Sequence, residues 1–180
     1  MITVWTSLDH TTLFHALWVQ NEMYNRKSML RLMIVLAAVE LLVTLPMHWI
    51  SPAADWGIRL AICAGVLLLY SIAVRPMRIK TLSDAAERLR QAGGGKPRLE
   101  YRFGEKEFSA SGLDEKSQTP YSEITALRET DRALLLMIDR TLLHAIRKED
   151  LSERERTALT ALLSEKTGLD WQKASVPGRD

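Results

Sequence analysis

The sequence has little cysteine, few aromatic residues and no strong excess of charge of either sign. Its 180 residues include one cysteine, Cys63, and 24 basic residues against 22 acidic ones, which gives a net charge of +2. A lone cysteine excludes a disulfide within one chain and a redox-active cysteine pair. Basic and acidic residues alternate from residue 98 onward instead of forming a basic stripe, which argues against nucleic acid as a partner.

Catalytic and metal-binding motifs are missing as well. His10 and His15 are five residues apart, not the four that place two metal ligands on one helix face. The run Gly93–Gly95 precedes Lys96, but it lacks the spacing of a phosphate-binding loop and indicates a hinge or loop. His144 stands in an apolar strand pattern, which is typical of a packed or edge histidine. We therefore expect no catalytic residue, no metal and no cofactor.

Two apolar windows dominate the first half of the chain, at Leu32–Ile50 and Ile58–Val74. As helices they would each be about 26 to 29 Å long, close to the roughly 30 Å of a bilayer core. Pro52 and Gly57 lie between them and indicate a tight turn. We therefore expect a transmembrane hairpin with spans at about residues 30–50 and 58–75. The alternative is a soluble helical domain.

Glu40 is the acidic residue near the middle of the first window. An acid at a helix centre costs roughly 2.5 to 3.5 kcal/mol of insertion free energy, which the surrounding Leu, Ile and Val residues can offset. We interpret Glu40 as a protonated intramembrane group that faces the second window or another copy. Ala61 and Gly65 lie four residues apart and are candidates for close helix packing or homodimer formation.

Basic residues flank the hairpin on the side away from its turn, and they are Arg26, Lys27, Arg31, Arg75, Arg78 and Lys80. The positive-inside rule then places both termini in the cytoplasm. The group after the second window, Arg75, Arg78 and Lys80, could also bind anionic lipid, or it could only set the topology. Because no short basic region and cleavage site stand ahead of the first window, we expect no removable signal peptide.

The residues before the hairpin predict a strand at Ile2–Thr6 and a helix capped by Asp9 or Thr11. The helix carries an apolar stripe of Leu13, Phe14, Leu17 and Trp18 that could lie on a membrane surface or, as we favour, pack on the C-terminal domain. Because the C-terminal domain is small, we expect the strand or this helix to complete its core.

The C-terminal region predicts an antiparallel meander of five or six strands from Pro97 onward, with a tight hairpin at Asp139 and Arg140. Ser152 and Glu155 form a capping box for a final helix that ends at Gly168. The expected divisions are 1–28, a strand and amphipathic helix; 29–75, the hairpin; 76–96, a juxtamembrane helix and glycine linker; 97–167, the sheet-plus-helix domain; and 168–180, a flexible tail.

The stretch YRFGEKEFSASGLDEKSQTPYSEITALRETDRALLLMIDRTLLHAIRKEDLSE, after an apolar hairpin, resembles the YcxB-like bacterial proteins. The resemblance implies a small antiparallel sheet domain of pleckstrin-homology-like appearance, with one C-terminal helix, on a membrane anchor. It implies no established activity. The expected fold class is therefore an α+β membrane protein in the bacterial inner membrane, with both termini cytoplasmic.

The expected function is a membrane-anchored cytoplasmic interaction or sensory module that is not an enzyme. Its expected partners are the lipid bilayer and a second copy or another membrane protein, without nucleic acid. A lipid-surface binding domain is one alternative. An enzyme whose residues converge from distant strands is the other.

Overall fold

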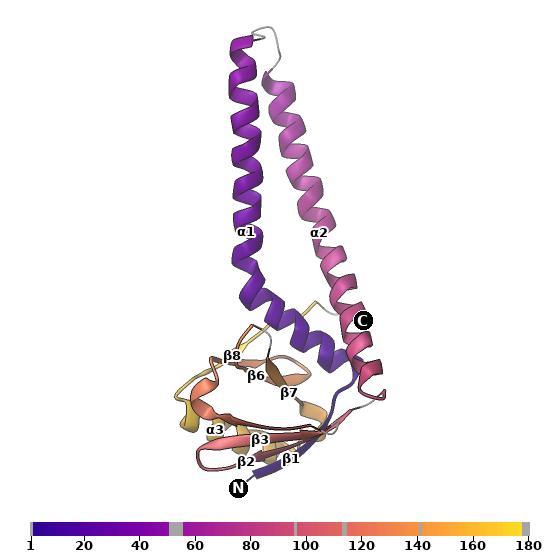
Figure 1. Ribbon diagram of the computed structural model, residues 1–180, viewed down its shortest axis with the longest axis vertical. Helices are drawn as coiled ribbons and strands as arrows, with labels where there is room; N and C mark the ends of the chain where they lie inside the picture. Colours follow the sequence, from indigo (N-terminus) through magenta and orange to yellow (C-terminus); the bar gives the residue numbers. More distant parts are fainter. Residues whose placement is uncertain (1, 51–55, 96, 113–114, 141, 178–180) are drawn as a thin grey trace. The chain divides into compact units, whose positions relative to one another are not determined.

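The chain divides into two units in a computed structural model that describes residues 2–50, 56–95, 97–112, 115–140 and 142–177. Within the two long helices, side chains between residues 25 and 75 are described only at some positions. The sheet unit contains Met1–Met23 and Leu82–Asp180, and the helical unit is Tyr24–Thr81. Figure 1 labels the helices and strands.

The first sheet is antiparallel and has the order β1-β2-β3-β4. Its strands are β1 (Ile2–Ser7), β2 (Arg98–Phe103), β3 (Glu107–Gly112) and β4 (Glu115–Pro120). Strand β1 pairs with β2 along its whole length, from Ile2 opposite Phe103 to Ser7 opposite Arg98. The predicted N-terminal strand is therefore confirmed, and it completes a sheet whose other strands lie some ninety residues later in the chain.

The second sheet is mixed and has the order β7-β6-β5-β8. Its strands are β5 (Ala126–Glu129), β6 (Ala133–Met137), β7 (Leu143–Arg147) and β8 (Trp171–Lys173). The predicted hairpin between β6 and β7 is confirmed, but its last pair is Met137 and Leu143, so the connection is longer than the tight two-residue turn expected at Asp139 and Arg140. Strand β8 pairs in parallel with β5 and lies in the segment that the sequence assigns to a tail. Two short 3-10 helices, η1 (Tyr121–Glu123) and η2 (Lys148–Asp150), follow β4 and β7.

The core of the sheet unit lies between the two sheets, which Figure 1 shows stacked with α3 (Glu153–Thr167) beside them. Strand alternation sends every second side chain inward, and helix α3 adds Leu159 and Leu163. The capping box of Ser152 and Glu155 starts this helix, and Gly168 ends it with φ 68° in the left-handed region, as predicted. The largest fully buried core side chains include Tyr101, Phe103, Phe108, Leu127, Leu134, Leu136 and Ile146.

Helix α1 (His10–Ile50) begins on the face of the second sheet that points away from the first sheet. Asp9 caps the helix, since its side chain accepts a hydrogen bond of 2.7 Å from the backbone N–H of Thr12. Phe14 and Trp18 are buried, and His15 Nδ1 lies 3.1 Å from Thr130 Oγ1 at the end of β5. The predicted packing of the apolar stripe on the C-terminal domain is therefore confirmed. Strand β6 is buried on both faces as a result.

Helices α1 and α2 (Trp56–Ala92) are 41 and 37 residues long. In the part of the chain that the structure describes, neither they nor α3 offer a segment with the length and apolar character that a membrane crossing requires. This finding contradicts the expected transmembrane hairpin and the expected inner-membrane localisation with cytoplasmic termini. Each apolar window is only part of a longer helix, because α1 and α2 both continue into polar turns that belong to the sheet unit. Helix α2 runs through Pro76 without a break.

The expected fold class is wrong for the same reason. Instead of an α+β membrane protein with one small antiparallel, pleckstrin-homology-like sheet, the chain is an α+β protein with one antiparallel and one mixed sheet. The sequence patterns after Pro97 identify individual strands, but they do not show where a meander divides into two sheets.

Candidate binding face

The outward side chains of the first sheet form a polar face with one large aromatic residue. The register aligns Trp5 with Glu100, Glu100 with Ser111, and Ser111 with Lys116 across the four strands. A neighbouring row aligns Thr3, Arg102, Ser109 and Gln118. We call this surface the β1–β4 face, and its residues are Thr3, Trp5, Arg98, Glu100, Arg102, Glu107, Ser109, Ser111, Lys116 and Gln118.

Trp5 is the exposed aromatic residue of this face. Its side chain is 61% exposed, whereas the adjacent Val4 is 3% exposed because it points into the core. The six-residue pairing of β1 with β2 fixes which of the two residues points outward. The pairing of β1 in the sheet therefore fixes Trp5 in an exposed position, and Trp5 does not belong to a loop.

Glu100 and Arg102 form a bidentate ion pair on this face. Arg102 Nε and Nη2 donate to the two carboxylate oxygens of Glu100 at 2.9 and 3.1 Å, and this hydrogen bonding raises the pKa of Arg102. Ser111 Oγ also donates to Glu100, at 3.4 Å. The Glu100 side chain is only 12% exposed, whereas that of Arg102 is 53% exposed. The acid is thus largely covered, and a guanidinium edge remains accessible.

A polar clamp holds the end of β1, and its residues are Thr6, Ser7, Asp9, Arg147 and Asp150. One carboxylate oxygen of Asp150 accepts hydrogen bonds from Thr6 Oγ1 at 3.1 Å and from the Ser7 N–H at 2.7 Å. The backbone N–H of Arg147 donates to Thr6 Oγ1 at 2.9 Å, and the Arg147 guanidinium lies 3.7 Å from the Asp9 carboxylate. The clamp joins β1 to β7 and η2, and so it supports the β1–β4 face from its edge.

Tyr101 and His144 are buried titratable residues that contact each other in the sheet unit, and burial shifts the pKa of both. The Tyr101 hydroxyl lies 3.4 Å from His144 Nδ1, and the His144 ring packs edge-on against Tyr101 and Phe108. Burial lowers the pKa of His144 to about 4 and raises that of Tyr101. His144 is therefore a neutral, packed core histidine at physiological pH, as its strand pattern predicts.

Two other histidines, His10 and His15, each connect separate elements of the sheet unit. His10 Nε2 lies 3.2 Å from the backbone oxygen and from the hydroxyl of Ser83, and so it links α1 to α2. His15 contacts Thr130, as described above, and burial lowers its pKa. Among the residues that the structure describes, no three His, Cys, Asp or Glu side chains are grouped as a metal site would need.

The sequence-predicted site residues lie on the two long helices. Glu40, Ala61 and Arg75 fall outside the residues whose side chains are described. Gly65 is half-buried, and a side chain built there would meet no atom within 4 Å. Arg78 is half-buried and Lys80 is exposed on α2. These residues belong to the helical unit, whereas the β1–β4 face belongs to the sheet unit.

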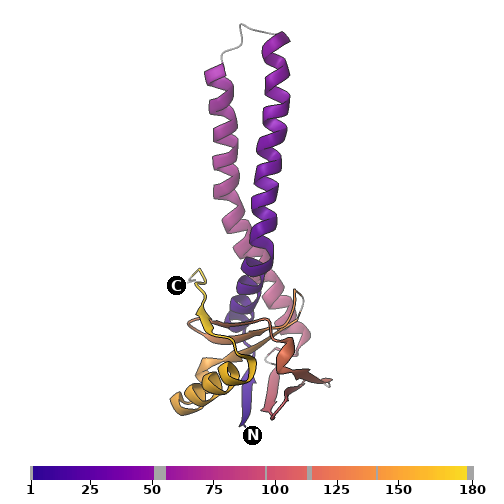
Figure 2. The same ribbon diagram turned by 90° about the vertical axis from the view of Figure 1, so that its left-hand side faces the viewer.

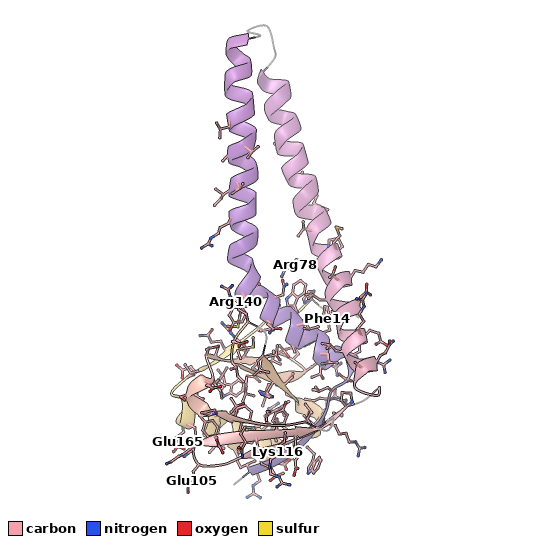
Figure 3. The ribbon with its side chains drawn as sticks, in the orientation of Figure 1. Phe14, Arg78, Glu105, Lys116, Arg140 and Glu165 are labelled. Atoms are coloured by element: carbon pink, nitrogen blue, oxygen red, sulfur yellow. The ribbon has the colours of Figure 1, made fainter. Side chains whose placement is uncertain are left out.

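Sequence reasoning missed the β1–β4 face. Trp5, Arg102 and Lys116 lie on three different strands, and their alignment depends on the register between segments far apart in the chain. Figure 3 labels Lys116 on this sheet. Two alternations separate an inward from an outward side in the sequence: that of Ile2 and Val4 with Thr3 and Trp5, and that of Leu99, Tyr101 and Phe103 with Arg98, Glu100 and Arg102.

Comparison with known proteins supports the family resemblance over part of the chain. The family model described as YcxB-like protein matches residues 103–163, from the end of β2 through most of α3. No curated protein and no solved structure is significantly similar to the chain. The match covers about a third of the sequence and leaves out β1, most of β2 and both long helices. Residues 103–163 are therefore a YcxB-like domain, and β1 and β2 complete its first sheet from outside the matched region.

Proposed function

We propose that the sheet unit is a non-catalytic protein-interaction module whose binding surface is the β1–β4 face. The observation that carries this proposal is the 61% exposure of Trp5 on a strand that is paired over all six of its residues. Tryptophan is among the residues that contribute most to binding at protein interfaces, where it is desolvated by a partner. A rigid strand also presents the side chain without the entropy cost of ordering a loop.

The surroundings of Trp5 resemble the rim of an interface. Small hydroxyl-bearing side chains, Ser109 and Ser111, lie on β3 opposite Arg102 and Glu100 and leave this part of the face shallow. Interfaces commonly combine an apolar anchor with such polar, hydrogen-bonding neighbours. The clamp at Asp150 keeps β1 in place, so the face is preorganised for a partner.

Site-specific photocrosslinking in cells tests this function. A benzophenone amino acid replaces Trp5 in the full chain, and Leu142, which is 45% exposed in the β6–β7 turn, is the control position. We expect position 5, but not position 142, to form a crosslink to one defined protein. Trp5→Ala should then weaken binding of that purified protein by about tenfold or more, as expected for a tryptophan hot spot.

Two results would contradict the proposed function. One is the same set of crosslinked proteins at positions 5 and 142, which would indicate random collisions. The other is a partner whose affinity is unchanged by Trp5→Ala. Circular dichroism of both variants controls for the fold, because a loss of binding by an unfolded chain would carry no information about the face.

A second copy of the chain is a candidate partner for the helical unit. The described exposed residues of α1 in this unit fall on one helix face, and they are Arg31, Ile34, Val35, Ala38, Val39 and Leu42. Ile34, Val35, Val39 and Leu42 are each more than half exposed, and Ala38 leaves a gap among these larger side chains. We propose that this face packs against the same face of a second chain, with large side chains entering the gap at Ala38.

Disulfide crosslinking of adjacent alanines tests self-association. Ala38 is exposed, whereas Ala37 is half-buried and points about 100° away around the helix. In a chain with Cys63 replaced by Ala, oxidation should convert the Ala38→Cys variant to a covalent dimer and leave the Ala37→Cys variant monomeric. Equal crosslinking of the two variants, or none, would contradict a shared face.

A further inference from the structure

We infer that the β1–β4 face binds an extended acidic polypeptide segment. This inference rests on the proposed function and names the chemistry of the partner. Trp5 supplies the apolar anchor, and the accessible positive charges of the face are those of Arg98 and Arg102 on the neighbouring strand and of Lys116 on β4. Of the two acids of this face, Glu100 is already paired with Arg102, and Glu107 lies at the other end of β3 from Ser111, the residue in the cross-strand row of Trp5. The face thus carries three basic and two acidic side chains.

The charge balance of the face favours an acidic partner. Arg98 and Lys116 are exposed, and in the described part of the chain neither forms an ion pair. Arg98 and Arg102 flank Glu100 on β2, so both lie diagonally across from Trp5 on the neighbouring strand. A carboxylate of a bound segment can therefore reach a cation while an apolar side chain of the same segment covers the indole.

The dimensions of the face favour a chain over a small anion. Trp5 and Lys116 lie on the first and fourth strands of the same cross-strand row. Neighbouring strands are about 4.8 Å apart, so the two residues are separated by about 14 Å. One phosphate or carboxylate cannot touch both. An extended polypeptide covers this distance with about four residues, at 3.3 to 3.6 Å each.

A polypeptide suits the face better than a nucleic acid strand does. Single-stranded nucleic acid is bound by several aromatic side chains in succession along a basic groove. Trp5 is the one aromatic residue of the β1–β4 face, and the remaining positions are serine, threonine, glutamine and charged residues. Hydroxyl and amide groups of this kind can hydrogen-bond to a peptide backbone.

Fluorescence anisotropy of the full chain with two peptides tests the inference. The first is a fluorescein-labelled octapeptide with alternating glutamates around one leucine, and the second carries lysine in place of each glutamate. We expect the glutamate peptide alone to bind, with an affinity that falls about tenfold between about 50 and 300 mM salt because screening weakens the ion pairs. Trp5→Ala and Lys116→Gln, at opposite ends of the face, should each weaken binding at least about fivefold.

Arg154→Gln is the matched control, because Arg154 is an exposed arginine on α3, away from the face, and should leave the affinity unchanged. Equal binding of the two peptides would overturn the inference, and so would a glutamate peptide that is insensitive to Lys116→Gln. Stronger, Trp5-dependent binding of oligothymidylate or of phosphatidylglycerol vesicles would also overturn it. A crosslinked partner at position 5 that lacks an acidic segment would refute the acidic chemistry and leave the interaction module intact.

Discussion

Removal of residues 1–7 from the full chain is expected to destabilise the sheet unit by more than about 3 kcal/mol. The truncation exposes the core around Val4, and full burial of such a side chain contributes about 1.5 to 3 kcal/mol. It also removes Thr6 and Ser7, which leaves the Arg147 N–H and the Asp150 carboxylate without their clamp partners. The Arg147 N–H is part-buried, so loss of its acceptor costs a further 1 to 3 kcal/mol, roughly, whereas the exposed Asp150 carboxylate can bind water instead.

Urea unfolding of the truncated chain measures this effect. Thr3→Ala serves as the control, because Thr3 lies on the same strand but is exposed, and its free energy of unfolding should stay within about 0.5 kcal/mol of the parent value. A truncated chain with the parent's unfolding midpoint would show that β1 is dispensable. The YcxB-like region would then be a complete domain without it.

Acidification is expected to destabilise the sheet unit through His144. Burial lowers the pKa of His144 from 6.5 in the unfolded chain to about 4 in the folded protein. The unfolded chain therefore binds more protons between these two values, and the stability due to neutral His144 is fully present above pH 6.5 and is lost as the pH falls toward 4. At 1.36 kcal/mol per pKa unit, the loss amounts to about 3 kcal/mol.

The His144→Phe variant isolates this contribution from that of the acidic residues. Phenylalanine keeps an aromatic ring beside Tyr101 and Phe108 but has no titrating nitrogen. The free energy of unfolding of the parent should fall more steeply than that of the variant as the pH is lowered from 6.5 to 4. Parallel curves would mean that His144 is hydrated or rearranges when it is protonated.

Local features of the fold follow directly from the sequence. The capping box at Ser152, the left-handed Gly168 and the β6–β7 hairpin depend on contacts between residues a few positions apart. Patterns of spacing capture such contacts well. The N-terminal strand also follows from the sequence, because Ile2 and Val4 alternate with Thr3 and Trp5. Its pairing with the C-terminal domain is expected because that domain alone has a small core.

Features that depend on distant contacts did not follow from the sequence. A three-residue strand such as β8 has no periodicity to detect, and its parallel pairing with β5 requires α3 to return the chain to the sheet. The apolar windows predicted two spans, but local hydrophobicity does not show that a helix continues for 41 residues from the sheet unit. The β1–β4 face likewise depends on the register of β1 with β2, which the sequence does not reveal.

The free energy of unfolding of Trp5→Ala, compared with that of Val4→Ala, tests most directly whether Trp5 serves to bind a partner and not to stabilise the fold. The two residues are neighbours on β1 with opposite orientations, and they are 61% and 3% exposed. The interaction module predicts a change within about 0.5 kcal/mol for Trp5→Ala, as for an exposed residue, and a loss of about 1 to 3 kcal/mol for Val4→Ala. A loss of about 3 kcal/mol or more for Trp5→Ala would contradict it, because Trp5 would then belong to the core of the fold and not to a binding face.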